Sequence, residues 1–139
     1  MAERILVDTG PIVAVLSRQD QFHTQCVAAL RAIRGQLVTC WPVLTEAAWL
    51  LRGRPHAIQR LLNSIDGGAF ALLPLGPDAL SWIASFMSRY QDLPAQLADA
   101  ALAYLADTEQ IDTVFTLDRR DFSVYRIRGD QSLRVIPQP

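Results

Sequence analysis

The stretch LVDTGPIVAVL, residues 6–16, joins an apolar run to an aspartate, a Thr-Gly-Pro turn and a second apolar run. The first run, which extends back to cover Arg4–Val7, is typical of a short buried strand. The second predicts a helix from Pro11 to Leu16, because proline is favoured in the first helical turn. Asp8 lies at the junction, where an aspartate either caps the helix or belongs to a site at the end of the strand.

The same alternation continues along the rest of the chain. Apolar residues at helical spacing predict a helix over 22–33, and Gly35 ends it. The complete expectation is strands at 4–7, 36–40, 70–73, 113–117 and 133–136, and helices at 11–16, 22–33, 42–51, 55–65, 77–90 and 97–107. Strands separated by helices indicate an α/β fold with a mainly parallel sheet covered on both faces. The chain has 139 residues, and 1–139 is expected to form a single domain.

The composition favours a folded protein without a membrane span. Half of the residues are hydrophobic and 19% are charged, which is too apolar for a disordered chain. No apolar run approaches the ~18 residues of a membrane-spanning helix. Asp8 interrupts the apolar start, so no signal-peptide core is expected. Cys26 and Cys40 lack the spacing of a zinc or redox motif, which predicts reduced thiols in a cytoplasmic protein.

Several functional classes are disfavoured by the charged residues. The net charge is −1, so no overall basic field attracts nucleic acid, and the 13 basic residues are all arginine. The absence of lysine excludes P-loop and receiver-domain chemistry. Asp-Thr-Gly is also the triplet of aspartic proteases, but those enzymes are β-rich and need two carboxylates. Gly10 argues against an aspartate-nucleophile phosphatase, which requires a second aspartate at that position.

Four acidic residues take related places in the predicted fold. Asp8 and Asp118 follow the first and fourth strands, whereas Glu46 and Asp99 lie near the starts of two helices. Sites in open α/β sheets form at the carboxyl ends of the strands, which the two helices could overlook. Several carboxylates without lysine or histidine among them make an oxygen-rich site for a hard divalent cation.

Each acid also has a structural explanation on its own. The three aspartates could serve as a helix cap, a helix-dipole partner and a turn residue. Glu46 is harder to explain, because its neighbours in WPVLTEAAWLL are mostly apolar and a buried, unpaired carboxylate is costly. A structural role for Glu46 would require Arg52 or Arg54 to fold back onto it.

The segments ILVDTGPIVAVL, LTEAAWLL, LADAALAYLA and VFTLDRRDF together resemble a PIN domain, as found in VapC-type toxins of bacterial toxin–antitoxin pairs. The likeness runs from about Arg4 to Phe122. It implies a three-layer fold, with a twisted parallel sheet between helices, and a Mg²⁺- or Mn²⁺-dependent ribonuclease. The motifs would make the catalytic, metal-binding quartet Asp8, Glu46, Asp99 and Asp118, with Asp121 at an accessory metal-binding position.

Two features depart from the family pattern. Many relatives carry a small hydroxyl or amide side chain where this chain has Gly10, which implies the loss of one hydrogen bond beside the quartet. The isoelectric point of about 6.1 also fits poorly with tight RNA binding. Neither feature affects the quartet itself.

The resemblance also implies an RNA substrate and a cognate antitoxin protein as partners. A metal ion in the quartet would activate water for attack on a phosphodiester. Thr9 and Thr116 could orient the metal ligands, or could be ordinary threonines at strand ends. Arg119 and Arg120 could bind a substrate phosphate, or could be solvated turn residues.

The helices around 42–65 carry more apolar surface than a small domain can cover, including Trp49, Leu50, Leu51, Leu61 and Leu62. We predict a homodimer with a neighbouring groove for the antitoxin; the alternative is that these residues face the core. Trp41, Trp49 and Trp82 are expected in the core or an interface, and His23 and His56 at the surface.

Two other functions would use the same residues. One is a catalytically idle, PIN-like interaction module. The other is a metal-dependent nuclease or phosphatase acting on DNA or another phosphoester, because no motif here reads a ribose 2′-hydroxyl.

Overall fold

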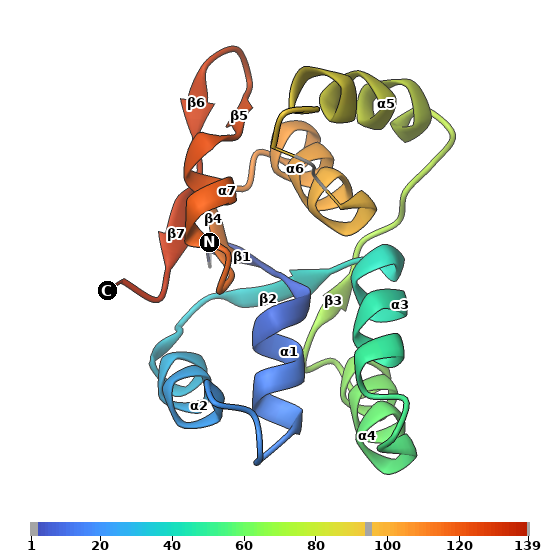
Figure 1. Cartoon of the computed structure of the whole chain (residues 1–139), viewed down its shortest axis with the longest axis vertical. Coiled ribbons are helices and arrows are strands. Elements are labelled where there is room, and N and C mark those ends of the chain that lie inside the picture. Colours follow the sequence, from blue (N-terminus) through green and yellow to red (C-terminus); the bar gives the residue numbers. More distant parts are fainter. Residues whose placement is uncertain (1–2, 94–95, 139) are drawn as a thin grey trace.

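The computed structural model describes residues 3–93 and 96–138, and Figure 1 shows a sheet with helices on both sides. Its central strand is β1 (Arg4–Val7), with β2 (Gln36–Thr39) on one side and β4 (Thr113–Phe115) on the other. The edge strands are β3 (Ala71–Leu72) and β7 (Arg134–Ile136). All neighbouring strands are parallel, which confirms the predicted α/β fold.

The strand order β3-β2-β1-β4-β7 places a topological switch beside β1. The chain leaves β1 toward β2 and later returns to the other side of β1 as β4. Leu6 pairs with Val38 of β2 and with Val114 of β4, so the three strands end close to the same level. Ligands of open α/β sheets bind outside the carboxyl ends of the strands at such a switch.

The helices form two groups around the sheet. On one side lie α1 (Thr9–Leu16) and α2 (His23–Ala32), and on the other lie α5 (Ala79–Arg89) and α6 (Leu97–Glu109) (Figure 1). α3 (Trp41–Leu50) contacts both α1 and α6, and α4 (Pro55–Asp66) follows it. Coverage of both faces explains why Ile5, Leu6 and Val7 are all buried.

α1 begins two residues earlier than predicted. Asp8 has an extended backbone and takes the N-cap position, with its side chain accepting a hydrogen bond from the Thr9 amide. Pro11 is therefore the third helical residue, where its missing amide hydrogen is still not needed. The structural role considered for Asp8 is real, and it places the carboxylate at the end of β1.

Three short elements were not predicted. They are α7 (Arg119–Val124) and the antiparallel hairpin of β5 (Arg126–Ile127) and β6 (Gln131–Ser132). With six residues, α7 is too short for apolar periodicity to reveal it. The hairpin turn contains Arg128 and Gly129 at positive φ, a conformation that glycine adopts freely.

Some side chains that were expected on the surface are buried or half-buried instead, and others are exposed as expected. Leu51 and Leu61 belong to the core, at 2% and 3% exposure, whereas Trp49 is 63% exposed. Trp82 stacks on Phe86 at the α5–α6 contact. The His23 ring was expected at the surface but is half-buried, because it forms a hydrogen bond with the Ala14 carbonyl. His56 is exposed, as predicted.

Within residues 3–93 and 96–138, no helix combines the length and the apolarity that crossing a bilayer would take. Both cysteines are buried and free of disulfides.

Candidate active site

The carboxyl ends of β1 and β4 open onto a pocket of about 440 Å³. It contains all four acids of the predicted quartet and is lined by Asp8, Thr9, Gly10, Glu46, Leu50, Gln96, Asp99, Leu117 and Asp118. The acids come from four elements: the end of β1, α3, α6 and the segment after β4. Residues that are 91 and 110 positions apart from Asp8 thus meet at the switch point of the sheet.

Asp8 is the most firmly held of the four. It is 6% exposed, and its two oxygens accept hydrogen bonds from the Thr9 amide at 2.8 Å and the Thr116 hydroxyl at 2.7 Å. Burial raises the pKa of Asp8 from 3.8 to about 6, although both hydrogen bonds oppose the shift. The charges of Glu46 and Asp118 make smaller contributions to the same shift.

Thr116 connects two of the acids. Its hydroxyl donates to Asp8 and accepts a hydrogen bond from the Asp118 amide at 2.9 Å. Thr116 is buried, so its hydroxyl donates its proton and accepts through one lone pair within the site rather than to solvent. The orientation of Asp8 and the backbone position of Asp118 therefore depend on one threonine.

Asp99 lies in the first turn of α6 and is 7% exposed. Its carboxylate accepts a hydrogen bond from the Tyr125 hydroxyl at 3.3 Å. Burial raises the pKa of Asp99 from 3.8 to about 7, and the negative charges of Asp8, Asp118 and Glu46 contribute. Burial and Asp99 also raise the pKa of Tyr125 above its usual value, so its hydroxyl remains protonated and donates.

Asp118 and Asp121 complete the acidic cluster. Asp118 is the N-cap of α7 and accepts a hydrogen bond from the Asp121 amide at 3.2 Å. Asp99, Asp118 and Asp121 each offer a carboxylate oxygen within 4.8 Å of the others. The pKa of Asp121 is raised, first by burial and then by its interaction with Asp118. The accessory acid thus lies with the quartet.

Glu46 is half-buried rather than buried, so it needs no cationic partner. Neither candidate partner folds back onto it. The Arg52 guanidinium stacks on the Trp49 ring at 3.9 Å from the centroid, and Arg54 donates to the Gln19 side chain.

The arginines and Thr9 take different positions. Arg119 donates to the Pro137 carbonyl, which ties it to the segment after β7. Arg120 is exposed, and its charge lowers the pKa of Asp121 against the other effects. The Thr9 hydroxyl is buried and lacks a hydrogen-bond partner among the described residues.

Two residues at the site carried no sequence signal. Tyr125 follows α7, a helix that the sequence did not predict, and Gln96 precedes α6. At Gly10, a Cβ would lie 3.4 Å from the Leu117 side chain. The space beside Gly10 is therefore bounded by an apolar side chain.

None of the clustered acids forms an ion pair in the described part of the chain. The ion pairs there are Arg4–Glu109, Arg126–Asp130, Arg128–Asp112 and Arg134–Glu3, and none includes a residue of the cluster. A group of carboxylates that offers only oxygen ligands fits a hard divalent cation. The donor set is compatible with magnesium or manganese.

Comparisons with known proteins agree with this geometry. A sequence profile of the PIN domain matches residues 5–127. The ribonuclease VapC26 of Mycobacterium tuberculosis is 30% identical over 135 residues, which cover 96% of this chain and all of VapC26.

Solved structures show the same fold. VapC20 of Mycobacterium tuberculosis, a sarcin-ricin loop cleaving toxin, superposes with a TM-score of 0.77 at 17% identity, covering 84% of this chain and 91% of VapC20. A chain of the Rickettsia felis VapBC2 complex, bound to a DNA fragment from its promoter, gives 0.63 at 11% identity, with 96% and 99% covered. By its sequence, and with a fold in agreement, the chain belongs to the PIN-domain family and is VapC-like.

Proposed function

We propose that this chain is a divalent-metal-dependent endoribonuclease and the toxin of a toxin–antitoxin pair. The observation that carries the proposal is the convergence of Asp8, Glu46, Asp99 and Asp118 on one pocket at the switch point of the sheet. The similarity to a ribonuclease along nearly the whole chain supports RNA as the substrate.

The metal ligands would be Asp8, Asp99, Asp118 and Asp121, with Glu46 at the margin of the site. A bound Mg²⁺ or Mn²⁺ supplies a water of lowered pKa and neutralises charge on a phosphodiester. The chain itself orients the ligands, since the Thr116 hydroxyl holds Asp8 and the amide of Asp121 holds Asp118.

The charge distribution is compatible with an RNA substrate once cations occupy the site. The cluster holds five of the 14 acidic residues, which leaves nine against 13 arginines. The slightly acidic net charge therefore reflects the site more than the remaining surface. Arg120, exposed beside Asp121, is our candidate for a phosphate contact, whereas the Arg119 guanidinium is already bound to a carbonyl.

The proposal is tested with purified protein and three substrates: structured RNA, single-stranded RNA and single-stranded DNA. Each is incubated with Mn²⁺, with Mg²⁺ and with EDTA. We expect metal-dependent cleavage of RNA and none in EDTA. Cleavage of DNA alone would indicate the alternative nuclease, and an intact set of substrates would indicate an interaction module.

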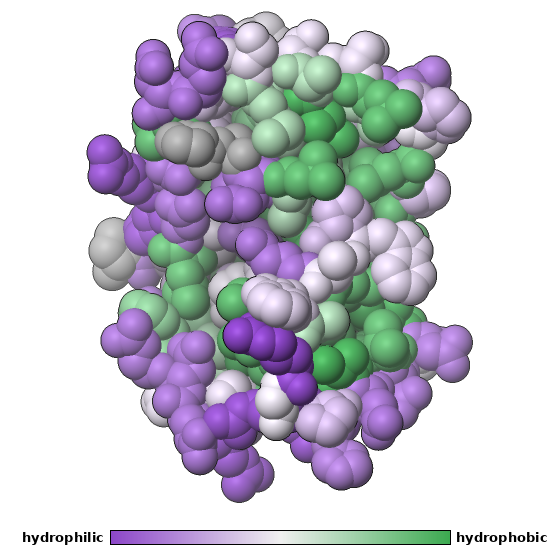
Figure 2. Space-filling model, turned by 45° about the vertical axis from the view of Figure 1, so that its right-hand side comes forward, coloured by the Kyte–Doolittle hydropathy of each residue, from purple (hydrophilic) through white to green (hydrophobic). Residues whose placement is uncertain are grey.

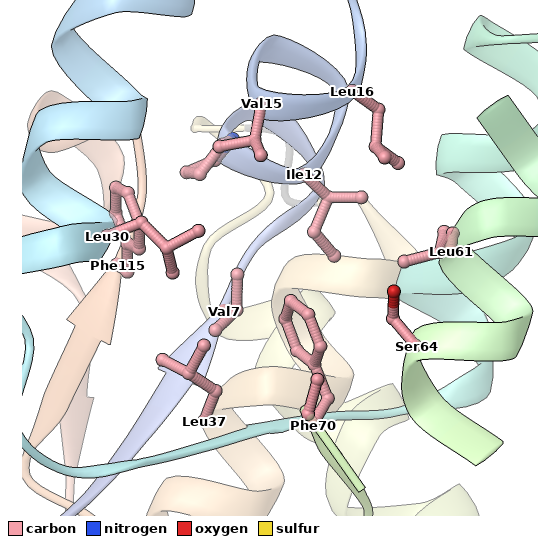
Figure 3. A pocket seen from close by; sticks show the side chains of 12 residues that line it. Val7, Ile12, Val15, Leu16, Leu30, Leu37, Leu61, Ser64, Phe70 and Phe115 are labelled. Carbon is pink, nitrogen blue, oxygen red and sulfur yellow. The ribbon is translucent and has the colours of Figure 1, made fainter. Parts of the chain in front are cut away.

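The antitoxin is proposed to insert an apolar anchor into a second pocket. This pocket, of about 400 Å³, lies between α1, α2, α4 and the sheet. Figure 3 shows aliphatic and aromatic side chains, among them Ile12, Leu30 and Phe70, turned toward one space. An apolar helix or extended segment is the kind of ligand that such a groove accepts.

The proposed compartment is the cytoplasm, where toxin and antitoxin would meet. The free thiols of Cys26 and Cys40 are compatible with this reducing environment.

Filling the second pocket should block the antitoxin without affecting catalysis. Ser64 lines the pocket from α4, so Ser64→Trp is expected to abolish co-purification of the product of the reading frame upstream of the gene. Its RNA cleavage should match the wild type. Asn63→Trp is the control, because Asn63 is exposed on the same helix and does not line the pocket. Equal antitoxin binding by both variants would exclude this docking site.

The homodimer is proposed to form through the exposed apolar side chains of α3 and α4. Trp49, Leu50 and Leu62 are 63%, 53% and 43% exposed. Figure 2 turns this side of the molecule forward and shows hydrophobic patches between polar ones. Clustered exposed apolar residues are typical of interfaces, particularly where they include tryptophan.

A charge on this surface should dissociate the dimer. Trp49→Arg is expected to give a monomer by light scattering at tens of micromolar, where we expect the wild type to be a dimer. Val124→Arg on α7 is the control, since Val124 is a 46% exposed apolar residue away from α3 and α4. A monomeric wild type would contradict the proposal.

A further inference from the structure

Tyr125 is fully buried at the end of α7, and its hydroxyl lies 3.3 Å from Oδ2 of Asp99. Asp99 belongs to α6, so the contact joins two elements across the edge of the candidate site. The separation is longer than the usual O–H···O distance of about 2.7–2.8 Å, but the acceptor is a buried carboxylate, which strengthens such a bond.

The ring of Tyr125 cannot easily swing away from Asp99. It makes edge-on contacts with Phe86, Tyr90 and Phe122, at centroid distances of 4.9, 5.1 and 5.2 Å. The aromatic cluster therefore positions the Tyr125 hydroxyl as a rigid group.

Asp99 depends on this hydroxyl more than Asp8 depends on any single partner. The Asp8 carboxylate accepts two hydrogen bonds, from Thr9 and Thr116. In the described part of the chain, the Tyr125 hydroxyl is the single hydrogen-bond donor to the Asp99 carboxylate. A buried carboxylate without a donor is poorly solvated, and its orientation is set by packing alone.

We propose that Tyr125 is a positioning residue of the metal site. Its hydroxyl holds the Asp99 carboxylate in the position where one of its oxygens lies within 4.8 Å of carboxylate oxygens of Asp118 and Asp121. The inference rests on the proposed metal-dependent function and adds a residue to it. Groups that hydrogen-bond a metal ligand typically contribute about 10–100-fold to metal affinity.

The test is the Tyr125→Phe variant of the full chain, titrated with Mn²⁺ by calorimetry. We expect Mn²⁺ to bind about tenfold more weakly than to the wild type. RNA cleavage should need correspondingly more Mn²⁺ for half-maximal rate and reach a similar maximum, a split that a general loss of packing would not produce.

Tyr90→Phe is the matched control. It removes a hydroxyl from the same aromatic cluster, but that hydroxyl bonds a backbone amide rather than a carboxylate. We expect wild-type Mn²⁺ affinity for this variant. Equal losses in both variants, or no loss in Tyr125→Phe, would overturn the proposal. A wild type that binds no Mn²⁺ removes the metal-dependent function itself, and this inference with it.

A second measurement does not require the Tyr125→Phe variant to fold. The chain has three tyrosines, so ¹³Cζ-tyrosine labelling gives three resonances, which Tyr90→Phe and Tyr104→Phe assign by elimination. Saturation with Mg²⁺ should shift the Tyr125 resonance and leave that of Tyr104 in place. A Tyr125 resonance indifferent to Mg²⁺ would overturn the positioning role.

Discussion

Asp99→Asn is expected to lower the rate of RNA cleavage at least about a hundredfold. Removal of a metal ligand costs more activity than removal of a residue that only hydrogen-bonds such a ligand. The metal-free variant should at the same time be more stable than the wild type, by on the order of 1–2 kcal/mol near neutral pH. The pKa of Asp99 is raised to about 7 by burial and by three neighbouring carboxylates, so its ionised form is disfavoured in the folded chain. An amide of the same shape removes that charge and still accepts the Tyr125 hydrogen bond.

Asp8→Asn should lose as much cleavage activity as Asp99→Asn, but its metal-free form should gain less stability. The Thr116 hydroxyl donates to Asp8 and accepts from the Asp118 amide. An amide nitrogen facing this hydroxyl would leave one of the two groups without a partner, which offsets the relief of charge repulsion. Melting temperatures in EDTA, compared between the two variants, measure the difference.

Asp118→Asn should keep the helix cap, because asparagine serves an N-cap as well as aspartate does. Its activity should nevertheless collapse, whereas Glu46→Gln, at a half-buried position, should lose less. Asp78→Asn is the control: Asp78 is an exposed N-cap residue of α5, without a side-chain capping bond. Wild-type cleavage by the three aspartate variants at the site would end the nuclease proposal.

These expectations rest on elements that were predictable from the sequence. β1 and α1 have short, strong patterns, and Asp8 lies between them, so its place at the end of a strand followed directly. The position of Asp99 in the first turn of a helix was predictable because LADAALAYLA has helical periodicity. The structure confirms this helix, and its alanines are buried. The alternation of strands and helices and the rule for open sheets predicted a site at the carboxyl ends of the strands, but they did not predict the strand order.

Other features depended on tertiary contacts that have no local pattern. Tyr125 reaches Asp99 because α7 ends beside α6, and nothing in RRDFSVY marks a hydrogen bond to a residue 26 positions earlier. Apolar neighbours suggested that Glu46 was buried, but the position of α3 at the mouth of the pocket leaves it half-exposed. Burial also differs between Leu51 and Trp49, which are two residues apart. At the end of α3 this spacing places the two side chains on different sides of the helix, so one is buried and the other exposed.

Stability should depend on pH more strongly without metal than with it. In EDTA, the melting temperature is expected to rise as the pH falls from about 7.5 to about 4.5. Burial raises the pKa values of Asp8 and Asp99 from 3.8 to about 6 and about 7. The folded chain therefore takes up protons at a higher pH than the unfolded chain, and its free energy of unfolding increases until the unfolded carboxyls protonate too. Each group contributes at most on the order of 3–4 kcal/mol, and the two titrate as a coupled pair.

With Mn²⁺ the slope should flatten, because the metal binds the ionised carboxylates, competes with protons and therefore stabilises the folded chain most at high pH. At about one hundred times its dissociation constant, Mn²⁺ should stabilise the protein by about 2.7 kcal/mol near pH 8, roughly 10 °C in melting temperature. The increment should nearly vanish at about pH 5, where both groups hold protons in the folded chain. Asp99→Asn should flatten the EDTA curve and reduce the Mn²⁺ increment, whereas Asp78→Asn should follow the wild type. A Mn²⁺ increment of equal size at both pH values would mean that the metal binds elsewhere, since a site built on Asp8 and Asp99 has to release protons when it fills.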